Sequence, residues 1–206
     1  MSGEKKQNVR MIFKVGAFLA FIMLGYLGIR SYKRSVEKLK INKCTEEIIS
    51  LVKNIQEAYF SSTDYGEFDY KTAERMKLFP SNMKREGFRE VTNAYMGGVD
   101  VYYSSLTPDR NRSAFEVSFQ GLSQMGCMAL LRLDLSSLNA IAVAGFATPT
   151  PSGVLDEIYV DTKPEEIKDR GRKFVARGVM YLSDEKAENA CACKSADECS
   201  VVWKFK

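Results

Sequence analysis

Histidine is absent from the 206 residues of this chain. Its absence excludes nucleophilic sites in which histidine activates a serine or cysteine, and every zinc site with a histidine ligand. Neither of the usual glycine-rich phosphate-binding patterns occurs, and no two carboxylates are spaced as an acid–base pair. We therefore expect no enzymatic activity, no cofactor and no small-molecule substrate.

A large excess of one charge is also missing. Lysine and arginine number 30, aspartate and glutamate number 26, and the net charge is +4. Because the basic residues of the globular part are scattered, as on an ordinary solvated surface, we expect no nucleic-acid partner. Hydrophobic residues make up 45% of the chain, which is enough for a core, and the length suits one domain with an appendage.

Residues 11–29 carry almost no charge. They read MIFKVGAFLAFIMLGYLGI, and Lys14 is their one charged residue. A helix needs about 20 apolar residues to cross a bilayer, so this run is just long enough if the Lys14 amine reaches the interface. A cleaved signal peptide is the alternative, but basic residues follow the run where a small-x-small cleavage site would stand. We favour an uncleaved transmembrane helix over 11–29, with the basic residues 1–10 in the cytoplasm.

The charges around this segment leave its orientation open. Basic residues lie before or at its start and again after its end: Lys5, Lys6, Arg10 and Lys14, then Arg30, Lys33, Arg34, Lys38, Lys40 and Lys43. Local charge alone would keep the C-terminal side in the cytoplasm. However, long domains cross membranes largely regardless of charge.

Glycine and proline are missing from residues 30–60. Ile48, Val52, Ile55 and Tyr59 recur there at helical spacing and form one apolar stripe. We expect an amphipathic stem helix over 30–60 that continues the transmembrane helix as one rod. Two helices with a hinge near Ser31 remain the alternative.

Residues 61–206 are typical of a globular head. Ser, Thr, Asp and Gly cluster in SSTDYGEF and end the stem. A short helix is expected over 70–77, closed by Pro80, and a later helix is expected to begin at Thr162.

Alternating strands predict an antiparallel sheet in this head. VDVYYS at 99–104 and FEVSF at 115–119 predict a hairpin, followed by a helix that Ser123 caps. Further strands are expected at residues 139–146, 157–160, 174–182 and 200–205. The predicted fold class is α+β, with a long N-terminal helix packed on a small antiparallel sheet.

Three stretches follow one another in a recognisable order. The first is LVKNIQEAYFSSTDYGEFDYKTAERMKLFPSNM, from Leu51 to Met83. The second is NAYMGGVDVYYS with FEVSFQGLSQMGCMALL, and the third is the terminal cysteine before an alternating last strand. Together they resemble the type IVb pilins, including the thin-pilus subunits of conjugative plasmids. The matching positions are Tyr59, Tyr65, Pro80, Met83, Tyr95, Gly97, Gly98, Val99, Val101, Phe115, Val117, Phe119, Cys127 and Leu130.

The resemblance implies a membrane-anchored structural subunit, as a minor pilin or a pilin-like component of a pilus, secretion or conjugation apparatus. Its anchor would cross the bacterial inner membrane once, with the head in the periplasm or in a surface filament. Other pilin subunits would be its partners, and Gly16, Gly25 and Gly28 would permit close helix contacts. Gly25 and Gly28 are three residues apart, not the four of the dimer motif. The alternative is an anchored binding or assembly protein that does not polymerise and whose head lies in the cytoplasm, where the six basic residues after Ile29 could meet anionic lipid headgroups.

The N-terminal part departs from the pilin pattern. Family members carry a glycine at the leader-peptidase site and a glutamate at the fifth mature position. Cleavage after Gly16 would place Phe21 there, and cleavage after Gly3 would place Asn8 there. We therefore expect a minor or permanently anchored subunit rather than a major pilin.

The five cysteines are interpreted through the same resemblance. In the family a helix cysteine pairs with one near the C-terminus, which implies a Cys127–Cys193 disulfide, with Cys191 as the second choice of partner. Cys199 could bridge locally to Cys191, which leaves Cys44 as a small apolar residue of the stem. A zinc site is the weaker alternative, because no C-x-x-C pair is present.

Overall fold

The structure is a computed structural model. It describes residues 2–84, 91–110, 112–147, 153–162, 174–177, 183–193 and 198–206, without the side chains of residues 2–21 and 174–177. The chain divides into two compact units, Met1–Leu39 and Lys40–Lys206.

Helix α1 spans Ser2–Ala58. It is continuous at Ser31, where the alternative prediction placed a hinge between two helices. Its first 38 residues belong to the first unit and the remainder to the second. Within the residues whose side chains are described, no helix has an apolar stretch long enough to cross a membrane. Residues 11–21 of the predicted transmembrane segment lie outside that part of the chain.

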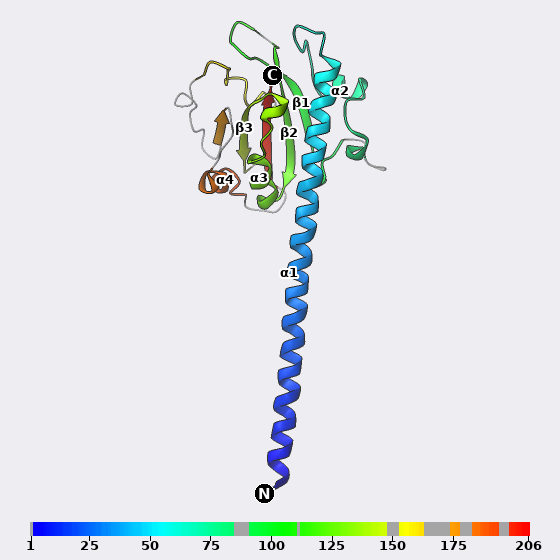
Figure 1. Cartoon of the computed structure of the whole chain (residues 1–206), viewed down its shortest axis with the longest axis vertical. Coiled ribbons are helices and arrows are strands. Elements are labelled where there is room, and N and C mark those ends of the chain that lie inside the picture. The colour runs from blue at the N-terminus through cyan, green and yellow to red at the C-terminus, as the bar shows by residue number, and fades with distance from the viewer. Residues whose placement is uncertain are drawn as a thin grey trace. The chain divides into compact units, whose positions relative to one another are not determined.

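The second unit is built on a five-stranded antiparallel sheet, as the sequence predicted. Its strands are β1 (Val99–Ser104), β2 (Ala114–Leu122), β3 (Ala140–Phe146), β4 (Phe174–Arg177) and β5 (Cys199–Phe205). Their order in the sheet is β1-β2-β5-β3-β4, and every pair is antiparallel. The predicted β1–β2 hairpin is confirmed, and the C-terminal strand lies between β2 and β3 (red in Figure 1).

One face of this sheet packs against the end of α1. Successive side chains of a strand point to opposite faces, so Phe115, Val117 and Phe119 share a face of β2. Trp203 on β5 is the register partner of Val117. These side chains are fully buried in one cluster with the stem residues Cys44, Ile48, Leu51, Val52 and Ile55.

Short helices complete the head. They are α2 (Tyr70–Arg75), α3 (Gln124–Leu131), α4 (Asp184–Ala190) and the 3₁₀ turns Ser81–Met83 and Ser136–Leu138. Ser123 caps α3 as predicted, since its hydroxyl accepts the Gly126 N–H at 3.0 Å. Helix α4 was not predicted.

Three predicted elements of the head have a different outcome. Residues 157–160 do not form the predicted strand. The helix predicted from Thr162 and the second half of the predicted strand 174–182 lie outside the described residues.

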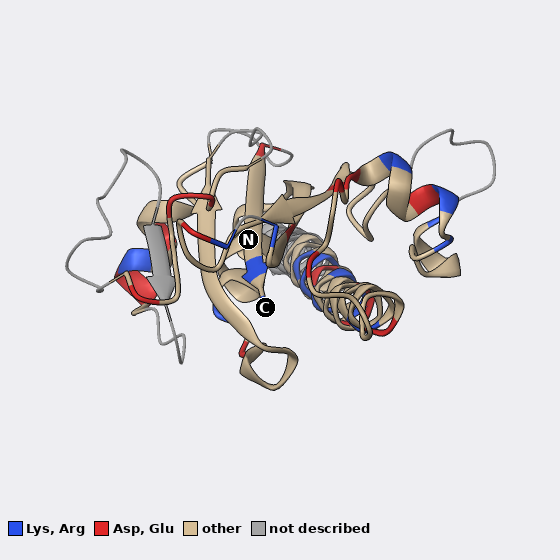
Figure 2. Cartoon of the chain, turned by 90° about the horizontal axis from the view of Figure 1, so that it is seen from above, with Lys and Arg blue, Asp and Glu red and all other residues tan. Residues whose placement is uncertain are grey.

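The second face of the sheet is covered by residues 153–162. Leu155 and Ile158 form a small apolar cluster there with Ala142, Ala144, Phe146 and Val202. Acidic and basic residues are interspersed over the head (Figure 2), in keeping with an ordinary solvated surface.

Candidate functional site

The stem stripe predicted from the sequence faces the protein's own head. Ile48, Val52 and Ile55 are fully buried. Tyr59 is half-buried, with its ring centroid 5.1 Å from that of Tyr65 and 5.4 Å from that of Phe68. These four side chains therefore hold the stem against its own sheet, and a neighbouring subunit has no access to the buried three.

A second set of apolar side chains on α1 is exposed, and we call it the apolar helix surface. Its members are 51–72% exposed: Ile22, Met23, Leu24, Tyr26, Leu27 and Ile29. A Cβ atom added at Gly25 or Gly28 would meet nothing within 4 Å, so both glycines lie open for close approach. Gly16 lies in the part of α1 whose side chains are not described, so its surroundings are outside the described part of the chain. An exposed apolar patch of this kind marks a contact with lipid or protein.

Basic and aromatic residues follow the apolar helix surface along α1. Arg30, Lys33 and Arg34 are exposed, and the Tyr26 and Tyr32 side chains are 65% and 70% exposed. Tyrosine rings favour the level of lipid headgroups, and long basic side chains reach the same level. This order of residue types fits a helix that leaves a bilayer near Arg30.

The four cysteines of the head form two disulfides. Cys127 on α3 is bonded to Cys191, with Cα atoms 5.9 Å apart and a sequence separation of 64. Cys193 is bonded to Cys199 at the start of β5, across six positions. The structure thus uses the second-choice partner of Cys127, and neither the first-choice Cys127–Cys193 bridge nor the local Cys191–Cys199 bridge is formed.

Helix α4 is the reason for this pairing. It packs against α3 and ends at Cys191, whose N–H donates to the Ala187 carbonyl at 3.0 Å. Cys191 is fully buried beside Cys127, whereas Cys193, two residues beyond the helix, is only half-buried. A sequence interpretation without α4 could not separate the two candidates.

Cys44 is the one cysteine of the chain without a disulfide. It is fully buried in the stem, and burial, followed by the negative charge of Glu47, raises the pKa of its thiol to about 12. Since the thiolate is the reactive form, this thiol is inert at ordinary pH.

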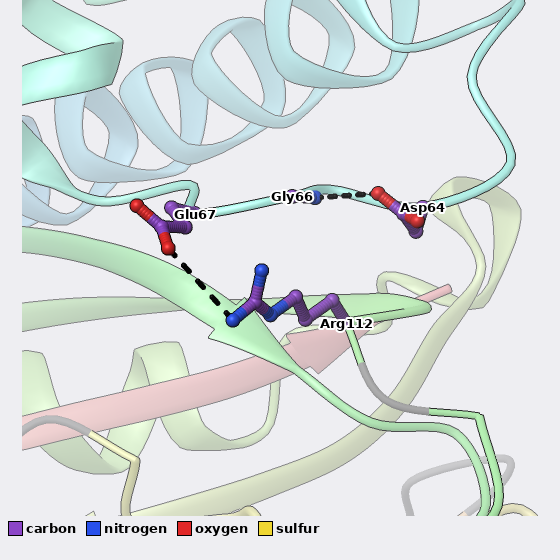
Figure 3. Close-up of polar contacts among 4 residues, drawn as sticks. All are labelled: Asp64, Gly66, Glu67 and Arg112. Atoms are coloured by element: carbon purple, nitrogen blue, oxygen red, sulfur yellow. Dashed lines mark hydrogen bonds and ion pairs between the residues drawn. The ribbon is translucent and has the colours of Figure 1, made fainter.

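The loop after α1 meets the β1–β2 loop at one end of the head. The Tyr65 N–H donates to the Arg112 carbonyl at 2.7 Å, and the Arg112 guanidinium lies 3.9 Å from the Glu67 carboxylate. Asp64 folds the loop by accepting the Gly66 N–H at 2.8 Å (Figure 3).

Open polar hollows of about 790 and 660 Å³ flank this loop. The ion pair beside them is exposed, so it contributes little to stability. Within the described part of the chain, no group of His, Cys, Asp and Glu side chains could hold a metal ion.

Comparison with known proteins identifies a matching family model and similar folds. The family model described as PilS N terminal matches residues 38–166. TcpA, a type IV pilin from Vibrio cholerae El Tor biotype, has a similar fold with a TM-score of 0.55 at 16% identity, over 82% of this chain and 99% of that chain. A type IVb pilin from Salmonella typhi matches with a TM-score of 0.50 at 10% identity, over 80% and 98%. A search of curated proteins finds no match.

Proposed function

The chain belongs to the family described as PilS N terminal, and on this premise we propose that it is a membrane-anchored pilin-like structural subunit. Residues 11–29 cross the inner membrane once, and the head lies in the periplasm. Assembly takes place through helix–helix contacts of α1 and through head–head contacts. The protein acts by binding its partners and carries out no catalysis.

The observation that carries this proposal is the division of α1 into two apolar surfaces. The stripe from Ile48 to Ile55 is buried inside the head, whereas the apolar side chains from Ile22 to Ile29 are exposed. Exposed apolar area of this kind is unfavourable in water by about 25 cal/mol per Å². Lipid and the corresponding helices of other subunits are the partners that would cover it.

The disulfides support the periplasmic location. Disulfides such as Cys127–Cys191 persist in oxidising compartments and are rare in the reducing cytoplasm. Local charge alone would favour a cytoplasmic head, but long domains cross membranes largely regardless of flanking charge.

Cysteine labelling tests the topology. In the variant Lys71→Cys the new thiol lies on the exposed side of α2, and Cys44 contributes no background because it is buried. We expect a membrane-impermeant maleimide to label Lys71→Cys in cells whose outer membrane is opened and whose inner membrane is intact. The matched control Lys6→Cys should be labelled only after the inner membrane is disrupted. The reverse pattern would place the head in the cytoplasm and contradict the proposal.

A second candidate function is an anchored protein of the same fold that does not polymerise. It is favoured by the lack of an acidic residue between Glu4 and Glu37, so that no carboxylate can occupy the fifth mature position of the pilin pattern. With its head in the periplasm, this candidate has the same topology as the first and differs in whether two copies meet along α1.

A further inference from the structure

The second face of the sheet contains two fully buried residues of opposite charge. Glu116 on β2 and Lys204 on β5 are 0% exposed and are register partners across the two strands. Both hold the covering segment. The Lys204 amine donates to the carbonyls of Leu155 at 3.1 Å and Ile158 at 2.6 Å, and the Glu116 carboxyl accepts the Leu155 N–H at 3.2 Å.

The hydroxyl of Ser104 on β1 lies between two carboxyl groups. Its Oγ is 2.8 Å from Oε1 of Glu116 and 2.9 Å from Oδ1 of Asp156. A hydroxyl has one hydrogen to donate, so it can satisfy only one of two carboxylates. The second contact becomes a hydrogen bond only when one carboxyl group itself carries a proton.

Burial places this proton on Glu116. Asp156 is exposed to solvent, whereas Glu116 is completely buried, and burial disfavours the charged form of a carboxyl group. A neutral Glu116 satisfies every contact at once. Its Oε1–H donates to Ser104, the Ser104 hydroxyl donates to Asp156, and Oε2 still accepts the Leu155 N–H.

The charges of the cluster give the same result. One lysine can neutralise one of the two carboxylates, and the surplus carboxylate favours a bound proton. Tyr102 on β1 adds no charge, because burial raises the pKa of its hydroxyl, and the Tyr159 ring lies 5.6 Å from the Lys204 amine. From β3 the described neighbours on this face are the apolar Ala142, Ala144 and Phe146. Asp100 of β1 shares the face, and its negative charge also raises the pKa of Tyr102.

We propose that Glu116, Ser104 and Asp156 share one proton, and that this proton fastens residues 153–158 to the second face of the sheet. Loss of the proton leaves two carboxylates competing for the single Ser104 hydrogen. The covering segment then separates from the sheet at Asp156, and the cluster behaves as a pH-sensitive latch.

Burial shifts the pKa of Glu116 and the pKa of Lys204 in the directions that favour the neutral form of each side chain. Burial raises the pKa of Glu116 from 4.5 to about 7, against the opposing hydrogen bonds from Ser104 and Leu155. A raised carboxyl pKa contributes stability that is complete below pH 4.5 and is lost as the pH rises towards 7. Burial lowers the pKa of Lys204 to about 8, so its contribution has the opposite sign and is lost as the pH falls through that value.

Amide hydrogen exchange of the full-length protein in detergent tests the latch. With exchange corrected for its intrinsic pH dependence, we expect the protection of residues 153–158 to fall as the pH rises from about 4.5 to about 7 and to level off above that value. Release of one proton gives a slope that approaches tenfold per pH unit. Amides in the centre of β2 and β5 serve as the internal reference and should keep their protection.

Two variants make the test specific. Glu116→Gln should keep the segment protected across this pH range, because its amide donates to Ser104 and its carbonyl accepts the Leu155 N–H without titrating. Ser104→Ala should leave the segment weakly protected at every pH. If Ser104→Ala does not fold, infrared spectroscopy decides by the carbonyl band of a protonated carboxyl group, which the wild type should show near pH 6 and Glu116→Gln should lack. Protection that stays flat with pH in the wild type, the same slope in Glu116→Gln, or no such band would each overturn the proposal.

Discussion

At the scale of single residues, Gly97 is a position of the head where any side chain would collide with the backbone. A Cβ atom at Gly97 would overlap the Gln120 carbonyl and lie 2.7 Å from Cα of Gly121. Asn93 holds the two segments in this arrangement, since its amide donates to the Gln120 carbonyl at 2.7 Å and its side-chain oxygen accepts the Tyr95 N–H at 2.8 Å. The close approach joins the turn before β1 to the end of β2.

Replacement of Gly97 by alanine should therefore destabilise the head. The atoms in the way belong to the backbone and cannot rotate aside, so we expect a loss of roughly 1–3 kcal/mol in the free energy of unfolding. Gly98→Ala is the matched control, because its nearest neighbour is the Gln120 side chain at 3.5 Å, and its effect should stay within about 0.5 kcal/mol. Urea unfolding of the two variants in detergent measures the difference. Equal unfolding midpoints would contradict the claim that the backbone at Gly97 leaves no room for a Cβ atom.

The buried charges of the second face could not be predicted from the sequence. In FEVSF and SVVWKF, Glu116 and Lys204 alternate with apolar residues, and this pattern is typical of a strand with one face in water. The covering segment that buries them, residues 153–162, has no hydrophobic periodicity. Its residues 157–160 were predicted to form a strand. Only the tertiary structure shows that the polar face is enclosed.

At the scale of elements, the two disulfides differ in the length of chain that they close. Cys127–Cys191 spans 64 positions and Cys193–Cys199 spans six. In the chain-entropy account the longer loop stabilises the folded state by roughly 4 kcal/mol and the shorter by roughly 2 kcal/mol, relative to the reduced chain.

Paired serine substitutions test this order. Cys127→Ser with Cys191→Ser should lower the free energy of unfolding by about 2 kcal/mol more than Cys193→Ser with Cys199→Ser. Peptide mapping of the non-reduced wild type provides the connectivity control. A Cys127–Cys193 peptide in that map, or a larger loss from the Cys193 and Cys199 pair, would contradict the account.

Helix α4 explains why the cysteine pairing was the weakest part of the sequence interpretation. It has seven residues, and its buried side chains are only Ala187 and Ala190, so it has no apolar stripe by which to be recognised. Its local signals are the N-cap Ser183, whose hydroxyl accepts the Lys186 N–H, and the acidic Asp184 and Glu185 in its first turn. By contrast, the stem stripe and the β1–β2 hairpin have strong periodicity, and both were predicted correctly.

At the scale of the whole molecule, the fold follows from patterns that act over long stretches of chain. The 3.6-residue period of the stem and the two-residue period of β2 and β5 each define a buried face, and these faces pack together as one core. The strand order could not be derived in this way, because placing β5 between β2 and β3 depends on contacts between distant parts of the sequence.

Photo-cross-linking in living cells tests the central claim, that copies of this subunit associate along the apolar helix surface. A benzophenone amino acid placed at Leu27, which is 58% exposed, should cross-link to a second, differently tagged copy of the chain and produce a series of multimers. The same probe at the buried Ile48 is the control and should yield no adduct between copies, because that position faces its own head. Adducts of Leu27 with lipid alone, and none that contain both tags, would contradict the account and favour the anchored protein that does not polymerise.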